Sequence, residues 1–158
     1  MSRLDSMLRR FTAQRDGLNW AAKTIADLEG DVLDMGLGNG RTYDHLREIL
    51  PGRRIWVMDR VLQCHPSCVP PEEDFLQGEA EPMLRKLAEQ GQSLALAHYD
   101  FGMGIKEDDV AEAARLSPLI AAVMKPGGLL VSGQPLVGFE QIKGPETIAP
   151  DRYLFYRA

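Results

Sequence analysis

The chain has 158 residues, which is enough for one domain with a hydrophobic core and too few for two. Its apolar fraction of 44% and charged fraction of 26% are typical of a globular protein, and its net charge of −5 argues against a nucleic-acid-binding surface. No apolar run could span a bilayer, the N-terminus lacks the apolar core of a signal peptide, and two cysteines make no disulfide framework. We therefore expect one cytoplasmic domain over residues 1–158, in which residues 1–30 form a helical cap and residues 31–158 form the core.

The N-terminal cap contains two segments with apolar residues at helical spacing. The first segment begins near Leu4 and ends at Gly17. The second runs from Asn19, a potential N-cap, to Gly30, a potential stop. We therefore expect two helices before the first strand.

Short apolar runs bounded by turn-forming residues predict five strands, at about residues 32–35, 54–58, 74–77, 94–97 and 129–132. Helical patterns lie between most of them, at about residues 41–50, 82–91 and 108–124. The last pattern contains Pro118, which is expected to kink or divide the helix, and residues 125–128 are expected to form a turn. Residues 61–74 contain three prolines and are expected to be irregular, without a crossover helix.

The C-terminal part differs, because residues 137–143 and 153–157 read as two strands with no helix between them. Such strands are expected to pair as an antiparallel hairpin. Alternating strands and helices followed by a hairpin predict an α/β protein with a doubly wound, mostly parallel sheet and helices on both faces. The exposed edge of the hairpin is a place where a homo-oligomer could assemble.

The most informative stretch is residues 32–40, Val-Leu-Asp-Met-Gly-Leu-Gly-Asn-Gly, in which an apolar run leads into a glycine-rich turn and then a helix. Glycine lets backbone N–H groups approach a ligand, and the helix start offers unpaired donors. A second acid, Asp59, ends the next apolar run about twenty residues further on, where an acid that binds ribose hydroxyls is expected. The spacing differs from the G-x-G-x-x-G of dinucleotide-binding proteins, because Arg41 holds the place of the third glycine.

Residues 32–40, with Asp34 two positions before the first glycine, resemble the first motif of the class I S-adenosylmethionine-dependent methyltransferases. The resemblance covers about residues 30–158 and implies a Rossmann-like sheet, S-adenosylmethionine as the cofactor and methyl transfer to an acceptor. It implies that the amino-acid part of the cofactor lies against the glycine loop, with its ammonium near Asp34. The loop residues assigned to the cofactor in this way are Gly36, Leu37, Gly38, Asn39 and Gly40.

Two further loops complete the cofactor site that the resemblance implies. Asp59 would hold the ribose through its two carboxylate oxygens. Arg60 follows it, and because an arginine here can bind a 2′-phosphate, a NADP-dependent oxidoreductase stays open as an alternative. After the third strand, Glu79 and Ala80 would contact the adenine, although an acid at position 79 would also suit the start of a helix.

The loop after the fourth strand carries His98, Tyr99 and Asp100, at the place where the family has groups that face the transferred methyl. The ordinary pKa of histidine suits a general base, and Asp100 could orient that base or the acceptor. His98 and Asp100 share one side of the strand and Tyr99, assigned to the cofactor, has the other. The alternative for His98 is a buried histidine with a structural role.

The N-terminal helices would cover the cofactor, with Trp20 and Phe11 closing over it and Arg15 or Asn19 near its carboxylate. Ordinary helix packing is the alternative for these residues.

Metal binding is not expected. Cys64, His65 and Cys68 are too few ligands for a zinc site. Asp100 with Asp108 and Asp109 could bind Mg²⁺, but the latter two suit a helix start better.

The functional prediction is a methyltransferase that acts on a small molecule, without a nucleic-acid or membrane partner. The Asn-Pro-Pro-aromatic motif of many methyltransferases that modify nucleic-acid bases is absent, because His98 to Phe101 occupy its place. Two alternatives stay open beside it. One is a protein that binds S-adenosylmethionine or S-adenosylhomocysteine without catalysis, and the other is the NADP-dependent oxidoreductase.

Overall fold

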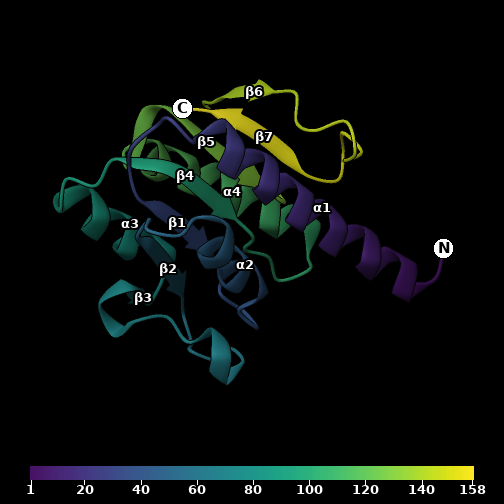
Figure 1. The fold of residues 1–158 in the computed structure, drawn as a ribbon, viewed down its shortest axis with the longest axis horizontal. Helices are drawn as coiled ribbons and strands as arrows, with labels where there is room; N and C mark the ends of the chain where they lie inside the picture. Colours follow the sequence, from purple (N-terminus) through teal and green to yellow (C-terminus); the bar gives the residue numbers. More distant parts are fainter.

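The computed structural model describes all 158 residues and contains one seven-stranded sheet (Figure 1). Its strands are β1 (Val32–Met35), β2 (Ile55–Asp59), β3 (Phe75–Gln77), β4 (Leu94–Tyr99), β5 (Met124–Ser132), β6 (Glu140–Ile142) and β7 (Leu154–Arg157). Their order across the sheet is β3-β2-β1-β4-β5-β7-β6. Strands β1 to β5 are parallel, and β7 runs antiparallel to its neighbours β5 and β6. The predicted mostly parallel sheet with a C-terminal antiparallel hairpin is therefore confirmed.

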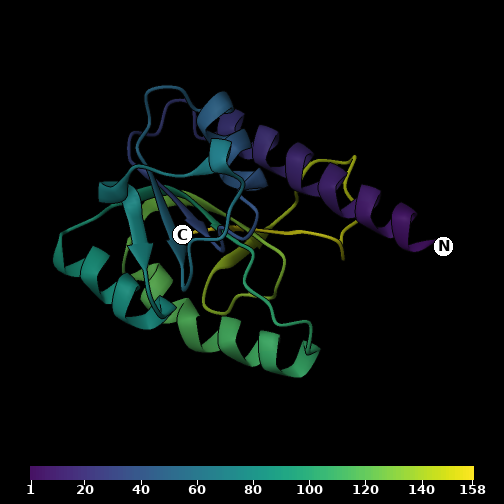
Figure 2. The same ribbon diagram turned by 90° about the horizontal axis from the view of Figure 1, so that it is seen from below.

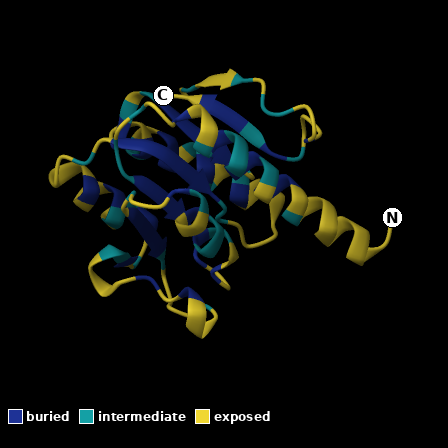
Figure 3. Ribbon diagram, in the orientation of Figure 1, coloured by how far each residue is buried: buried dark blue, intermediate teal, exposed yellow.

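Helices cover both faces of the sheet: α1 (Arg3–Thr24), α2 (Arg41–Ile49), α3 (Ala80–Glu89) and α4 (Lys106–Ala121). Figure 2 shows α1 and α2 on one face and α3 and α4 on the other. Successive residues of β1 enter different cores, since Val32 packs with α1 and α2 whereas Leu33 and Met35 pack with α3 and α4. Strands buried on both faces are apolar at most positions, and Figure 3 shows the central strands buried. The polar exceptions are Asp34 in β1 and His98 in β4.

The connection between β2 and β3 holds no helix longer than a single 3₁₀ turn, as predicted for residues 61–74. It contains two such turns, Pro66–Cys68 and Glu72–Asp74. None of the helices in the molecule combines the length and the hydropathy that crossing a membrane requires.

The prediction of two N-terminal helices is wrong, because α1 continues through Gly17 to Thr24. Gly17 does not end the helix. It lies where α1 packs on β7, and a Cβ at this position would lie 3.2 Å from Cζ of Phe155. The glycine therefore serves close packing between a helix and a strand, which a sequence pattern cannot distinguish from a helix stop.

Two predictions in the second half of the chain also need correction. Pro118 does not divide α4, which runs unbroken from Lys106 to Ala121. The turn expected at residues 125–128 is instead part of β5, which begins at Met124 and has an irregular register opposite β4 between Leu94 and Leu96. A bulge of this kind lets a Pro/Gly-rich segment remain in a sheet.

Candidate cofactor-binding site

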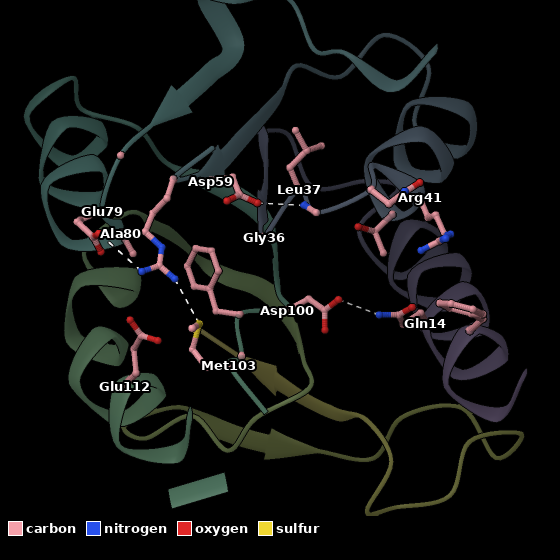
Figure 4. Close-up of a pocket in the computed structure, with 18 residues that line it drawn as sticks. Gln14, Gly36, Leu37, Arg41, Asp59, Glu79, Ala80, Asp100, Met103 and Glu112 are labelled. Carbon is pink, nitrogen blue, oxygen red and sulfur yellow. Dashed lines mark hydrogen bonds and ion pairs between the residues drawn. The ribbon is translucent and has the colours of Figure 1, made fainter. Parts of the chain in front are cut away.

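A cavity of about 270 Å³ opens at the carboxyl ends of β1, β2 and β4, at the point where the strand order reverses (Figure 4). Ligands of doubly wound sheets bind at this position. Its wall comes from the glycine loop, the ends of β2 and β3, the loop after β4, and one face each of α1 and α4. The lining residues are Phe11, Gln14, Gly36, Leu37, Gly38, Asn39, Arg41, Thr42, Asp59, Arg60, Gly78, Glu79, Ala80, Asp100, Phe101, Gly102, Met103 and Glu112.

The glycine loop approaches β4 so closely that a side chain at its first glycine would not fit. Gly36 has a φ of 103°, and a Cβ on it would lie 2.9 Å from the carbonyl oxygen of Asp100. Gly38, by contrast, borders open space and donates its N–H to Asp59. The loop therefore presents backbone to the cavity on one side and packs against protein on the other.

Gly40 was predicted to contact the cofactor, but it faces away from the cavity. It is the N-cap of α2 with a φ of 90°, and a Cβ on it would overlap Cβ of Cys68. The His65 N–H also donates to the Asn39 carbonyl, at 3.1 Å. The connection after β2 thus supports the glycine loop from outside, and Gly40 is needed for this packing.

Asp59 ends β2 and directs its carboxylate into the cavity. Its Oδ2 accepts the N–H of Gly38 at 3.0 Å, and its Oδ1 lies 3.4 Å from the N–H of Val61. Because a carboxylate has about four acceptor positions, Asp59 can still accept hydrogen bonds from two vicinal hydroxyls. The geometry fits a ribose at this point.

The wall beside β3 and α3 combines an ion pair with apolar side chains. Nη1 of Arg60 lies 3.9 Å from Oε1 of Glu79, and its Nη2 lies 3.4 Å from Sδ of Met103. Glu79 is the N-cap of α3 but its side chain makes no capping hydrogen bond, so the helix start does not use this carboxylate. Ala80 and Phe101 add apolar surface nearby, and this combination suits a flat heterocycle with an amino group.

Asp100 follows β4 and is held by two side chains of α1. Nε2 of Gln14 donates to its Oδ2 at 2.9 Å, and Nη2 of Arg10 lies 3.2 Å from its Oδ1. Burial raises the pKa of the Asp100 carboxyl, and the nearby charges of His98 and Arg10 offset only part of this rise. Asp100 lines the cavity and links it to the N-terminal helix, and its role in catalysis stays a prediction.

The prediction that His98 faces the acceptor as a general base is wrong. Its side chain is fully buried on the sheet face beneath α1, where Nδ1 lies 2.7 Å from Oδ1 of Asp34 and Nε2 lies 2.7 Å from the hydroxyl of Tyr153. Burial lowers the pKa of His98, but the hydrogen bond and negative charge of Asp34 outweigh it, so the pKa is raised. Both ring nitrogens are used within the protein, which supports the structural alternative.

Asp34 likewise does not line the cavity, which argues against the direct form of its predicted interaction with the cofactor ammonium, whereas an interaction through water stays a prediction. It is fully buried and shared between His98 and the hydroxyl of Thr42, which donates to Oδ2 at 3.2 Å. The acid of the motif therefore joins β1 to β4 and to α2. It reaches the cavity only through Thr42, which lines the wall.

Tyr99 and Trp20 also lie outside the cavity wall. Tyr99 is buried in the core on the α3 and α4 side, where its ring packs edge-on against Phe101 at 5.4 Å. Trp20 packs edge-on against Phe155 at 5.2 Å, which is the ordinary helix packing of the alternative. Tyr99 shapes the site only through Phe101, and neither Tyr99 nor Trp20 lines the cavity as the cofactor contacts predicted for them require.

The sequence did not identify eight of the lining residues: Gln14, Arg41, Thr42, Gly78, Phe101, Gly102, Met103 and Glu112. One signal was available for Gln14, because a glutamine between Phe11 and Leu18 interrupts an otherwise apolar helix face. The two candidates for the cofactor carboxylate are engaged elsewhere, since Arg15 pairs with Asp16 and Asn19 contacts a ring nitrogen of His45.

The residues considered for metals have structural contacts instead. Asp109 accepts the N–H groups of Met103 and Gly104, at 2.7 and 3.1 Å, and so fixes the loop before α4. The His65 ring contacts Ser67. No group of three or more His, Cys, Asp or Glu side chains is arranged to hold a metal ion.

A family model described as S-adenosyl-L-methionine methyltransferase matches residues 1–158. The chain is also similar to the S-adenosyl-L-methionine methyl transferase of Silicibacter pomeroyi. The two share 36% sequence identity, and their structures superpose with a TM-score of 0.94 over 99% of this chain and 98% of that one. A comparison with curated proteins finds no similar sequence.

More distant structures share the fold and carry the demethylated cofactor. Human methyltransferase-like protein 13, in complex with S-adenosylhomocysteine, has 9% identity and a TM-score of 0.56 over 94% of this chain and 79% of that one. The plantazolicin methyltransferase BpumL, also in complex with S-adenosylhomocysteine, has 12% identity and a TM-score of 0.52 over 82% of this chain and 49% of that one. The match to the family model over the whole chain agrees with the motif at residues 32–40. The chain therefore belongs to the S-adenosyl-L-methionine methyltransferase family, and is a class I enzyme that uses S-adenosylmethionine.

Proposed function

We propose that the protein transfers the methyl group of S-adenosylmethionine to a small-molecule acceptor in the cavity at the carboxyl ends of β1, β2 and β4. The observation that carries this proposal is that Asp59 and Asp100 line the same cavity. Asp59 has free positions to accept hydrogen bonds from a ribose, and Asp100 is held across the cavity by Gln14. The net charge of −5 supports a small molecule over a nucleic acid.

The cofactor site uses the cavity from one end to the other. We assign the adenine to Glu79 and Ala80, the ribose to Asp59, and the amino-acid part to the loop of residues 36–39. Bound there, S-adenosylmethionine supplies an electrophilic methyl group on a sulfonium. The open space above Gly38 and the unused acceptor positions of Asp59 support this arrangement.

Asp100 is the residue that we assign to the acceptor. Methyl transfer is an in-line displacement, so positioning and exclusion of water contribute most of the catalysis. A carboxylate fixed by Gln14 and Arg10 can orient an acceptor, and its raised pKa favours taking up a proton from one. No role in proton transfer is assigned to His98.

A second function, binding of the cofactor without catalysis, is favoured by one specific observation. Arg10 and Gln14 make three hydrogen bonds to the Asp100 carboxylate, which has about four acceptor positions, so an acceptor has one free position or must displace a side chain of α1. Release of S-adenosylhomocysteine in a screen of metabolites, with RNA, DNA and peptides in parallel, separates the two functions. Turnover with a metabolite supports the proposal, whereas turnover only with a polymer contradicts the small-molecule assignment.

The ribose assignment predicts that Asp59→Ala abolishes most cofactor binding without unfolding the protein. Calorimetric titration with S-adenosylhomocysteine measures the affinity, and thermal unfolding checks the fold. Asp27→Ala is the matched control, because Asp27 is exposed in the turn after α1 and does not line the cavity. An unchanged affinity in Asp59→Ala would refute the assignment.

The acceptor assignment predicts a different result for Asp100→Asn. The amide keeps the shape and can still accept from Gln14, and Asp100 is assigned to the acceptor and not to the cofactor, so the affinity for S-adenosylhomocysteine should change less than about threefold. Turnover of any acceptor found in the screen should fall by about a hundredfold, as for loss of a general base. Retained turnover would remove Asp100 from the reaction.

Self-association, expected from the edge strand β6, stays a prediction that light scattering can check.

A further inference from the structure

Arg41 is the charged side chain of the cavity wall that the structure leaves without a polar partner. The others are all engaged: Asp59 with Gly38, Arg60 with Glu79, Asp100 with Arg10 and Gln14, and Glu112 with Arg115. Arg41 makes no hydrogen bond and no ion pair. The guanidinium lies over the ring of Phe11 in α1, a cation–π contact that uses none of its N–H groups. All its hydrogen-bond donors are therefore free beside the cavity.

Helix stability does not explain this arginine. Arg41 is the first residue of α2, where a positive charge opposes the helix dipole. Arg47, at the other end of the same helix, is a useful comparison. It also lies over a ring, that of Tyr43, but it is paired with Asp44 and favoured by the dipole. Arg47 thus has a structural explanation that Arg41 lacks.

The position of Arg41 along the cavity identifies the part of the cofactor that it would meet. Figure 4 shows Arg41 and Gln14 on one side of the cavity, Glu79 and Ala80 on the other, and Asp59 between them. With the adenine at Glu79 and the ribose at Asp59, the amino-acid part must extend toward Arg41. That part ends in a carboxylate, the group that a planar guanidinium binds through two parallel hydrogen bonds.

We propose that Arg41 binds the carboxylate of the amino-acid part of the cofactor and that Phe11, whose ring lies 5.2 Å from the guanidinium carbon, holds it in place. The proposal rests on the cofactor orientation given under the proposed function. Phe11 itself lines the cavity, so α1 contributes to the cofactor site through a cation–π contact as well as through Gln14. Arg15 and Asn19, the residues expected from the sequence, are not needed for this role.

The test compares two ligands that differ only in the carboxylate, S-adenosylhomocysteine and its decarboxylated form, in calorimetric titrations of the wild type and Arg41→Gln. We expect the variant to bind S-adenosylhomocysteine about tenfold more weakly, as for one lost charge-assisted hydrogen bond. Its affinity for the decarboxylated ligand should equal that of the wild type. Phe11→Leu should show the same selectivity with a smaller loss, about threefold, since the cation–π contact is exposed.

Arg47→Gln is the matched control, and both ligands should bind it as they bind the wild type. Equal losses for the two ligands in Arg41→Gln would overturn the proposal, because the damage would then not concern the carboxylate. Unchanged binding of both would overturn it as well. If the wild type bound neither ligand, the cofactor site given under the proposed function would be refuted. That result differs from one in which the wild type binds S-adenosylhomocysteine and only the role of Arg41 is refuted.

Discussion

Asp34 and His98 form a buried pair beneath the glycine loop, and their arrangement corrects what their positions in the sequence imply. Both are fully buried, they lie opposite each other in the paired strands β1 and β4, and Tyr153 completes the hydrogen bonding of the ring. A buried carboxylate is costly unless it is paired, and His98 provides the partner. The motif acid of this chain therefore stabilises the floor of the site through His98 and Thr42.

The pair predicts a pH-dependent stability. A histidine whose pKa rises on folding stabilises the fold fully below its ordinary pKa, near 6.5, and this contribution is lost as the pH rises through the higher folded value. His98→Gln should therefore cost most below about pH 6.5, on the order of 3–5 kcal/mol for a broken buried pair, and less at alkaline pH. Urea unfolding of the wild type and the variant across this range measures the difference.

The control for this prediction is His65→Gln, which changes an exposed histidine whose ring contacts only its neighbour Ser67. Its free energy of unfolding should follow that of the wild type at every pH. A cost of His98→Gln that stays constant or grows toward alkaline pH would show that His98 is neutral in the folded protein.

Helix α1 extends from the core past the cavity and away from the sheet. The sequence pattern predicted two helices here, whereas the structure has one. Its C-terminal half packs on the sheet through Leu18 and Ala21, its middle gives Phe11 and Gln14 to the cavity, and its N-terminal half projects away from the sheet (Figure 1). Leu4 on that projecting half is 67% exposed. The N-terminal half, the middle and the C-terminal half of α1 can share one face of the helix only because the helix is continuous.

Gly17 is where this helix meets the C-terminal strand. The Phe155 ring lies against Gly17 on one side and against Gly144 on the other, where a Cβ would overlap it, and Trp20 packs on its edge. The ring therefore cannot move away from a methyl group. Gly17→Ala should lower the free energy of unfolding by about 1–2 kcal/mol, because overpacking outweighs the gain in helix propensity.

Urea unfolding tests this, with Phe155→Leu as the companion change. In the Phe155→Leu background the added methyl has room, so Gly17→Ala should there cost little or stabilise the protein. A stabilisation by Gly17→Ala in the wild-type background, the result of helix propensity alone, would contradict the packing account.

The sequence predicted those elements whose signals are local. Strands β1 to β5, the irregular connection after β2 and the antiparallel hairpin were all identified from apolar runs and turn residues. Gly17, Pro118 and residues 125–128 misled because each carries a local stop signal that tertiary contacts override. In the site, residues 36–39 and Asp59 were identified from the motif. The assignment of Arg41 depends instead on its contact with Phe11 of α1, and no local sequence pattern encodes the distance between these two helices.

On the scale of the whole molecule, two hydrophobic cores share one sheet. One core joins α1 and α2 to the sheet and the other joins α3 and α4, and residues of β1, β2, β4 and β5 contribute to both. Cores that share their strands cannot unfold independently. We therefore expect thermal unfolding to give one cooperative transition, seen at the same temperature by far-UV and near-UV circular dichroism, and two separate transitions would contradict the single-domain prediction.

The central claim is that the cavity formed by residues 36–39 and Asp59 binds S-adenosylmethionine, and binding to the intact protein tests it most directly. Calorimetric titrations with S-adenosylhomocysteine and, in parallel, with NADP separate the cofactor classes. The account predicts one bound S-adenosylhomocysteine per chain and no heat with NADP. At a hundredfold excess over its dissociation constant, the ligand should also stabilise the fold by about 2.7 kcal/mol. Absence of heat with S-adenosylhomocysteine at millimolar concentration, or binding of NADP alone, would contradict the account.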